Sequence, residues 1–405
     1  MKINTLEDLE LKGKTVLARL DINSPIDPES GEIISDFRIK SHLPTIEALK
    51  NSKLVLIAHQ SRPGRSDFTT LEKHAGILKK LCQGRVKYLD CLFGSHARRE
   101  INGLKNGDVL VLENVRFCSE ETSSEIKKRS PEDQAKTIMV KKLSSYVDAY
   151  VNDAFAVSHR NQPSIVGFPE LLDSCGGKLM ENEVSNLENV LSVKGKPGVF
   201  LVGGAKANDS VLIMKKLLKN GVADIFLTSG IVGTIFLYAA GVNIGKENKR
   251  MIKDRGLESI KAEARGLLKK YPERIEMPMD FAYQKNGSRG ESSVESNKDH
   301  LIMDIGEQTI VKYKEIIKSA KVVVANGPCG IFEKEAFSRG THEILKSVAE
   351  SKGFSVISGG HLSAMVKTLK IDRKISYIST GGKATMSFLA GEKLPGIEAL
   401  KGKRS

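Results

Sequence analysis

The stretch Leu54-Val-Leu-Ile-Ala58-His59-Gln-Ser-Arg62 decides what kind of fold to expect. Five apolar residues follow one another without a polar interruption, and the run has the length of an ordinary strand. Such runs are typical of strands buried on both faces, as in parallel sheets that helices cover on each side. Polar and basic residues begin where the run ends. The stretch therefore predicts an inner strand of a parallel sheet, with functional side chains at its carboxyl end.

The same alternation of strand and helix recurs along the chain. Strands are expected at residues 15–20, 54–58, 86–89, 109–112, 149–152, 198–202, 225–228, 322–325, 355–357 and 376–378. Amphipathic helical patterns lie between them, at residues 39–49, 71–81, 134–143, 210–218, 307–319, 334–351 and 362–369. Short β-rich runs separated by helix-length segments favour parallel sheets with helices on both faces. We predict an α/β protein built from doubly wound, Rossmann-like sheets.

The length of 405 residues favours two lobes, because a single core rarely keeps growing beyond about 250–300 residues. Their boundary is expected between Pro169 and Pro197, where residues 179–191 form a helical pattern that Lys194-Gly-Lys-Pro-Gly198 ends. We predict an N-terminal domain at residues 1–178, a hinge helix at 179–196 and a C-terminal domain at 197–390. Residues 245–253 and 286–298 are expected to be loops or irregular inserts.

The amino-acid composition bears on the kinds of ligand that the protein binds and on the compartment in which it works. The formal net charge of +14 is compatible with an anionic substrate, with nucleic acid or with general solvation. The absence of Trp and the aromatic content of 5% argue against stacking on nucleic-acid bases. Five scattered cysteines without a Cys-x-x-Cys pair fit a reducing cytoplasm and predict neither a disulfide framework nor a zinc site. No segment reads as a signal sequence or as a membrane span.

Polar residues follow the predicted strands at the points where each strand ends. In the first half these include Asp21, Asn23, His59, Arg116 and Asp153. In the second half glycine-rich turns take this place, at Gly203-Gly204-Ala-Lys206, Asn326-Gly327-Pro328, Gly359-Gly360-His361 and Gly381-Gly382-Lys383. Ligands of open parallel sheets bind at the carboxyl ends of the strands. Arginine forks suit small phosphates and carboxylates, whereas glycine turns suit nucleotide phosphates, although isolated arginines are often only surface ion pairs.

The motifs together resemble the phosphoglycerate kinases. They are Leu20-Asp-Ile-Asn-Ser-Pro25, Asp36-Phe-Arg38-Ile, His59-Gln-Ser-Arg62-Pro-Gly64, Leu112-Glu-Asn-Val-Arg116-Phe, Val151-Asn-Asp-Ala-Phe155, His159-Arg160, Gly203-Gly-Ala-Lys206, Asn326-Gly-Pro328, Glu333-Lys-Glu-Ala-Phe337 and Leu394-Pro-Gly396. The resemblance implies a glycolytic, Mg²⁺-dependent kinase that transfers a phosphoryl group reversibly between 1,3-bisphosphoglycerate with ADP and 3-phosphoglycerate with ATP. It also implies two lobes facing across a cleft that holds the ligands, and a C-terminal segment, residues 391–405, that returns to the N-terminal lobe.

The resemblance assigns roles to particular residues. Those expected to bind the triose ligand are Asp21, Asn23, Arg38, His59, Arg62, Arg116 and Arg160. Those expected to bind the nucleotide are Gly203, Gly204, Lys206, Asp209, Gly230, Asn326, Pro328, Glu333, Gly359, Gly360, His361 and Leu362. Those expected to act on the transferring group are Arg38, Lys206, Gly381, Gly382 and Lys383. Glu333 would accept from a ribose hydroxyl; its alternative role is that of an acid in a first helical turn.

Three positions depart from the family pattern. Ser210 stands where a second lysine is usual, Lys383 replaces a usual glycine, and His361 replaces a usual magnesium-binding aspartate. We expect Lys383 to replace the missing cation, and Mg²⁺ to be held mainly by nucleotide phosphates because magnesium prefers oxygen ligands. No protein ligand of the metal is assigned. The two alternatives are a kinase for another carboxylic acid and a nucleotide- or nucleic-acid-binding relative without catalysis. We expect a cytoplasmic monomer or simple homo-oligomer, without nucleic-acid or membrane partners.

Overall fold

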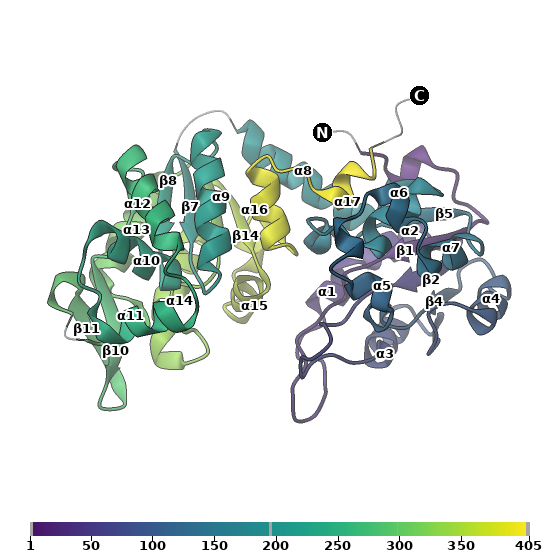
Figure 1. Cartoon of the computed structure of the whole chain (residues 1–405), viewed down its shortest axis with the longest axis horizontal. Helices are drawn as coiled ribbons and strands as arrows, with labels where there is room; N and C mark the ends of the chain where they lie inside the picture. Colours follow the sequence, from purple (N-terminus) through teal and green to yellow (C-terminus); the bar gives the residue numbers. More distant parts are fainter. Residues whose placement is uncertain (1–2, 194–196, 298, 402–405) are drawn as a thin grey trace. The chain divides into compact units, whose positions relative to one another are not determined.

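The computed structural model describes residues 3–193, 197–297 and 299–401. The chain forms two compact units (Figure 1). One takes in the residues up to Ser185 and those from Lys393 onward, and the other spans Asn186–Glu392. The change of unit falls inside α8 (Lys178–Ser192), the helix over which we expect a hinge. The last residues of that predicted hinge, and most of the Lys194-Gly-Lys-Pro-Gly198 segment, lie outside the described residues.

The first unit is built on a parallel sheet with the strand order β3-β4-β2-β1-β5-β6. Its strands are β1 (Thr15–Arg19), β2 (Lys53–Ile57), β3 (Val86–Tyr88), β4 (Val109–Val111), β5 (Ala149–Asn152) and β6 (Asp173–Gly176). Its other helices are α1 (Phe37–Ser41), α2 (Leu43–Ala48), α3 (Glu72–Leu81), α4 (Ser95–Asn102), α5 (Ser119–Thr122), α6 (Pro131–Gln134), α7 (Ile138–Ser144) and α17 (Pro395–Glu398). The expected helix at 39–49 is divided between α1 and α2 at His42.

Alternate residues of each inner strand supply the two cores of this unit. Val16 and Leu54 belong to the core that includes residues of α2 and α3, whereas Leu17 and Val55 belong to the core that includes residues of α4 and α7. Both faces are therefore covered, which explains the uninterrupted apolar run from which the strand was predicted.

The second unit repeats this architecture with the strand order β15-β14-β13-β7-β8-β9, again parallel. Its strands are β7 (Gly198–Val202), β8 (Ile225–Thr228), β9 (Ile275–Glu276), β13 (Val322–Asn326), β14 (Phe354–Ser358) and β15 (Tyr377–Ser379). Its helices are α9 (Ala207–Lys219), α10 (Gly230–Ala240), α11 (Gly245–Asp254), α12 (Ile260–Lys270), α13 (Glu307–Ser319), α14 (Arg339–Glu350), α15 (Gly360–Thr368) and α16 (Lys383–Leu389). The predicted α/β class with two doubly wound parallel sheets is confirmed.

The two expected loops are wrong. Residues 245–253 form α11, because the Asp299 carboxylate accepts from the backbone N–H of Lys246 (2.6 Å) and Ile252 is buried. Residues 288–293 form β11, which pairs with β10 (Asp280–Lys285) in a small antiparallel sheet that β12 (Asp304–Ile305) completes. Both segments are polar, so apolar periodicity could not identify them.

The C-terminal segment contacts the first unit. In Figure 1 α17, drawn in yellow, lies beside the early elements of the chain. The backbone N–H of Gly396 donates to the carbonyl of Ser158 (2.9 Å), and that of Asn4 donates to Leu400 (3.0 Å). Leu394, Ile397 and Leu400 are buried. Among the described residues, no helix is long and apolar enough to cross a bilayer.

Candidate active site

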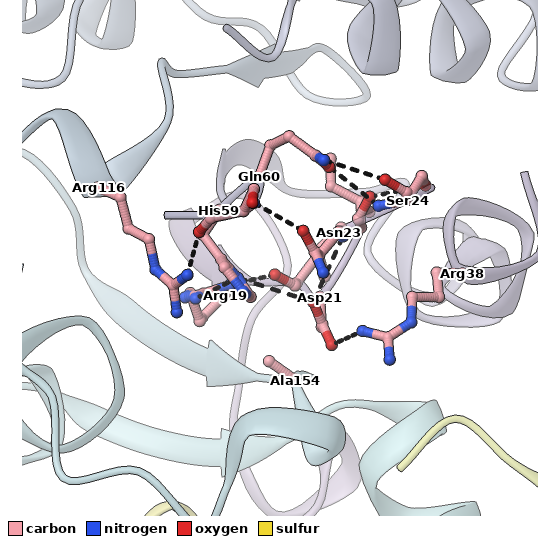
Figure 2. Close-up of polar contacts among 12 residues, drawn as sticks. Arg19, Asp21, Asn23, Ser24, Arg38, His59, Gln60, Arg116 and Ala154 are labelled. Atoms are coloured by element: carbon pink, nitrogen blue, oxygen red, sulfur yellow. Dashed lines mark hydrogen bonds and ion pairs between the residues drawn. The ribbon is translucent and has the colours of Figure 1, made fainter. Parts of the chain in front are cut away.

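The carboxyl ends of β1 and β2 bring charged side chains into the interior of the first unit. Arg19 is the last residue of β1, Asp21 follows two residues later, and His59 lies two residues beyond β2. Their exposed fractions are 1%, 3% and 2%. Figure 2 shows them turned toward one another. Because buried polar and charged groups are costly without partners, these residues must satisfy one another or a ligand.

Arg38, from α1, forms an ion pair with Asp21, in which the guanidinium Nη1 donates to the carboxylate Oδ2 (Figure 2). Burial acts to raise the pKa of Asp21, but the positive charges around it, first that of Arg38, lower the pKa well below its usual range. Asp21 is therefore a carboxylate that orients the Arg38 guanidinium at the end of the sheet.

Arg116 and Arg160 extend the positive group. Arg116 donates through Nη1 to the carbonyl of Ser61, and burial, helped by the nearby charge of Arg160, lowers its pKa to about 10. Burial also lowers the pKa of Arg160; the nearby charge of Asp21 opposes this shift, and that of Arg19 adds to it. The four guanidinium groups of Arg19, Arg38, Arg116 and Arg160 outnumber the two carboxylates, Asp21 and Glu121, that act on them, and Lys127 adds a further positive charge. Such a group attracts small polyanions.

Asn23 ties the loops after β1 and β2 together. The side-chain oxygen of Asn23 accepts from the backbone N–H of Ser61 (2.7 Å), and the backbone N–H of Asn23 donates to the Asp21 carboxylate (3.4 Å). Arg62 follows Ser61 in the exposed part of this loop. The structure thus gathers Asp21, Asn23, Arg38, His59, Arg116 and Arg160, and leaves Arg62 on the surface next to them.

Four residues that sequence reasoning missed support this group. Arg19, Glu121 and Ser164 are buried together, and the Arg19 Nε donates to the Ser164 hydroxyl (3.1 Å). His42 accepts from the backbone N–H of Asp21 at Nε2 (3.1 Å) and bonds the Asp153 carboxylate at Nδ1 (2.6 Å). The one available signal was Arg19 itself, a charged residue inside the apolar run at residues 15–20.

In the second unit, glycines meet at the ends of β7 and β13. The backbone N–H of Gly203 donates to the carbonyl of Asn326 (2.9 Å), and that of Gly204 to Pro328 (2.8 Å). A Cβ on Gly203 would lie 2.3 Å from the Pro328 oxygen, and one on Gly327, whose φ is +86°, would lie 2.4 Å from the Gly203 oxygen. Connections from these neighbouring strands run to opposite sides of the sheet, and ligands bind at such points.

The predicted turns after β8, β14 and β15 also lie at this edge. Gly230 begins α10 and donates to the carbonyl of Cys329 (3.0 Å), while Gly359 donates to the carbonyl of Gly381 (2.9 Å). Gly360, His361 and Leu362 form the first turn of α15. Leu362 is buried, whereas His361 is exposed, with its ring 5.0 Å from that of Phe332. Glu333 lies exposed in the turn before the short helix η8 (Glu335–Phe337).

The two cations predicted for the nucleotide site lie at the starts of α9 and α16. Lys206 precedes α9 and is exposed. The Lys383 Nζ lies 2.8 Å from the Asp209 Oδ1, and each side chain is 45% exposed. Gly382 precedes α16, at the end of the Gly381 turn. Ser210, which stands where the family usually has a lysine, is buried. Lys383 therefore lies within reach of the helix turn from which that lysine is missing.

Comparisons with known proteins decide the family. The model of the family described as Phosphoglycerate kinase matches residues 6–392. A phosphoglycerate kinase of Methanothermus fervidus is 46% identical over 402 residues, covering 99% of this chain and 97% of its own, and one of Methanococcus maripaludis is 48% identical over 403 residues, covering 98% and 97%. The crystal structure of phosphoglycerate kinase from Pyrococcus horikoshii matches with a TM-score of 0.92 and 41% identity, covering 98% of each chain.

This chain belongs to the phosphoglycerate kinase family. Membership confirms the resemblance, the phosphotransferase class with a carboxyl group as acceptor, phosphoglycerate kinase activity and a place in glycolysis. Use of Mg²⁺ with ATP is implied by the family. The roles of individual residues stay predictions.

Among the described residues, the predicted nucleotide turns of the second unit offer few side chains that could ligate a metal directly. The predicted nucleotide turns present the exposed side chains of Lys206, Glu333 and His361, and the Asp209 carboxylate, which forms an ion pair with Lys383. In the described parts of the chain, no three His, Cys, Asp or Glu side chains cluster as a metal site. Donors of this kind fit a magnesium ion that arrives on the phosphates of a nucleotide, because Mg²⁺ keeps phosphate and water ligands in kinase sites.

Proposed function

We propose that the partly buried arginine group of the first unit binds 3-phosphoglycerate or 1,3-bisphosphoglycerate, and that the glycine turns of the second unit bind ATP or ADP. The observation that carries this proposal is the net positive charge at the carboxyl ends of β1 and β2, where four guanidinium groups outnumber two carboxylates. A small acid with one or two phosphates supplies the missing negative charge and can accept several charge-assisted hydrogen bonds at once.

Arg38 has the catalytic part in the first unit. In the direction of ATP use, a carboxylate oxygen of the triose acid attacks the γ-phosphorus of ATP in line, and the bond from phosphorus to the ADP oxygen breaks. Charge must be offset on the oxygen between the substrate carbon and phosphorus, and the Arg38 guanidinium, oriented by Asp21, is suited to do so. Asn23, His59, Arg62, Arg116 and Arg160 position the acid, and no covalent enzyme intermediate is needed.

The second unit positions the phosphoryl donor. The backbone N–H groups of Gly203, Gly204 and Gly381 donate within the protein, so these glycines shape turns that leave room for the phosphates. Gly382 offers a backbone N–H group, and Lys206 follows the transferring group. Lys383 supplies a second cation in place of the absent lysine at Ser210, which its 2.8 Å contact with Asp209 supports. Magnesium would be held mainly by the nucleotide phosphates, where it neutralises negative charge. The remaining nucleotide contacts are assigned to Gly230, Asn326, Pro328, Gly359, Gly360, His361 and Leu362, with Glu333 on the ribose.

The proposal includes closure about the hinge helix, which brings the two ligands together so that water is excluded during transfer. It also places the enzyme in the cytoplasm as a monomer or simple homo-oligomer. All five cysteines are free thiols, which suits a reducing compartment. Light scattering during size-exclusion chromatography measures the oligomeric state.

A coupled assay tests the reaction. The purified chain should consume ATP only when 3-phosphoglycerate and Mg²⁺ are both present, and a panel of other carboxylic acids should give little turnover. Calorimetric titrations assign the sites: Arg116→Ala should weaken binding of 3-phosphoglycerate and leave that of ADP unchanged. Binding of both ligands without turnover would point to a relative that has lost catalysis, and turnover with a different acid would identify another carboxylate kinase.

A further inference from the structure

A buried chain of hydrogen bonds runs from α5 to His59. The Ser164 hydroxyl donates to the Glu121 Oε1 (2.7 Å), and the Ser164 backbone N–H donates to the Oε2 (3.0 Å). The same hydroxyl accepts from the Arg19 Nε (3.1 Å), and the Arg19 Nη2 lies 3.1 Å from the His59 Nδ1. Glu121 and Ser164 have no exposed surface. The reaction proposed above assigns no part to either of them.

This series of hydrogen bonds determines which ring nitrogen of His59 carries a proton. A guanidinium can only donate, so the His59 Nδ1 must accept from Arg19 with its lone pair (Figure 2). The nearest Asp21 oxygen is 3.7 Å from the same nitrogen, which is too long for a hydrogen bond. Burial, opposed by Asp21 and supported by Arg19, lowers the pKa of His59 well below its usual value. A neutral imidazole with its proton on Nε2 satisfies all of these contacts.

Glu121 is one of two carboxylates that interact electrostatically with Arg19, and the other is Asp21. Burial raises the pKa of Glu121, and the charge of Arg19 opposes that rise. The fully buried guanidinium needs a neighbouring negative charge, and Arg19 and Glu121 interact electrostatically. Ser164 connects them by accepting from one and donating to the other. The Arg19 Nη1 also donates to the carbonyl of Leu20, the residue before Asp21, which orients the loop of the proposed triose site.

We propose that Glu121 and Ser164 are positioning residues of the triose site, which act through Arg19 to hold His59 as the neutral Nε2–H tautomer and so preset it as a hydrogen-bond donor to the bound acid. The part that concerns the acid rests on the proposed function. The tautomer itself does not, because it follows from contacts inside the first unit. An imidazole preset in one tautomer loses no free energy to proton rearrangement when the ligand binds.

The test begins with the unaltered full-length chain. Long-range ¹H–¹⁵N correlation spectra of protein labelled with ¹⁵N-histidine report which ring nitrogen is protonated, and a His59→Gln variant assigns the signal. We expect His59 to carry its proton on Nε2, without ligand, at pH 7. A proton on Nδ1, or on both nitrogens, overturns the proposal.

Two variants then separate positioning from general structure. Glu121→Gln removes the charge at nearly constant shape, and Ser164→Ala removes the connecting hydroxyl. In each, the His59 signal should shift toward a mixture of tautomers, and the KM for 3-phosphoglycerate should rise about tenfold while the KM for ATP stays constant. Glu113→Gln is the matched control, since Glu113 is a buried carboxylate of the same unit that accepts from Leu71 and Tyr88. It should leave the His59 signal unchanged.

The outcomes remain distinguishable. A folded Glu121→Gln protein with an unchanged His59 tautomer contradicts the proposal, whatever its activity. The expected tautomer together with no turnover on 3-phosphoglycerate refutes the proposed function and keeps the assignment of Glu121 and Ser164 to the anion site. If neither variant folds, the spectrum of the unaltered chain decides.

Discussion

The two units share a parallel-sheet architecture but build their candidate sites from different materials. In the first unit the site consists of long, charged side chains, gathered from β1, α1, η2 (Val115–Phe117) and the loops after β2 and β5. In the second it is built around glycine turns, in which a Cβ at Gly203 or Gly327 would overlap a neighbouring carbonyl oxygen, with Lys206 and Lys383 beside them. Side chains recognise the shape and charge of one small acid, whereas backbone N–H groups bind any phosphate in the right position. The difference suits one specific acid in the first unit and the phosphate chain that all nucleotides share in the second.

The largest effect should come from Arg38 in the first unit. Arg38→Ala removes the guanidinium that Asp21 orients, and we expect kcat to fall about 10²–10³-fold, as for the loss of one donor to a developing charge. Steady-state kinetics in both directions measure this. Arg99→Ala is the control, because that side chain is 75% exposed on the same unit. Equal kcat values in the two variants would remove Arg38 from catalysis.

The second unit should instead be sensitive to a single methyl group. Gly327→Ala puts a Cβ 2.4 Å from the Gly203 oxygen at φ +86°, so strain and overlap should together cost roughly 3–5 kcal/mol of unfolding free energy. ADP affinity should fall, and 3-phosphoglycerate affinity should not.

Gly221→Ala is the matched control, since Gly221 has a φ of +68° and open space around it. It should cost only the backbone strain, about 1–2 kcal/mol. Denaturant unfolding and calorimetry compare the two, and equal losses would show that the close approach of the turns is unimportant.

A site held by buried side chains should also depend on pH. His74 is buried, its Nε2 lies 3.0 Å from the Gln60 side chain, and burial lowers its pKa to about 4. The folded state then disfavours protonation, so its full stability is present above pH 6.5 and about 3 kcal/mol is lost as the pH falls from 6.5 to 4. His74→Gln should flatten this dependence in urea unfolding curves. If the free energy of unfolding of the unaltered chain did not change between pH 4 and 6.5, this prediction would be wrong.

Lys383 should show the smallest effect. Its exposed pair with Asp209 should contribute less than about 1 kcal/mol to stability, so Lys383→Ala should unfold almost like the unaltered chain. Turnover should nevertheless fall several-fold if Lys383 meets the nucleotide phosphates. Lys215→Ala is the control, because Lys215 on α9 makes a similar exposed pair with Glu263. Identical kinetics in the two variants would end the idea that Lys383 replaces the missing lysine.

The sheets were predictable because they are buried on both faces. Runs such as residues 54–58 and 322–325 lack polar interruptions, so their burial is visible in the sequence, and the residues that follow them fall at the predicted edges. The polar strand β11 was not predictable, because its pairing with β10 and the contacts of Arg289 with Asp304 stabilise it rather than an apolar pattern.

The residues that hold the side chains of the candidate site in place could not be predicted from the sequence either. Ser164 lies 145 residues from Arg19 along the chain, and nothing in the local sequence of either residue indicates that they meet. Motif positions named the residues expected to touch ligands, such as Asp21 and Arg38. They did not name the residues that hold those side chains in place, because that information lies only in the packing.

The return of α17 to the first unit sets an order of events during synthesis. Residues up to Ser185 leave the ribosome about 200 residues before Lys393, a delay of roughly 10–40 s at translation speeds of about 5–20 residues per second. Synthesis of the second unit is complete before Leu394, Ile397 and Leu400 can pack against the apolar surface of the first unit. During that interval the apolar surface that Leu394, Ile397 and Leu400 later cover is exposed on the nascent first unit. A chaperone would bind this surface, and aggregation would begin from it.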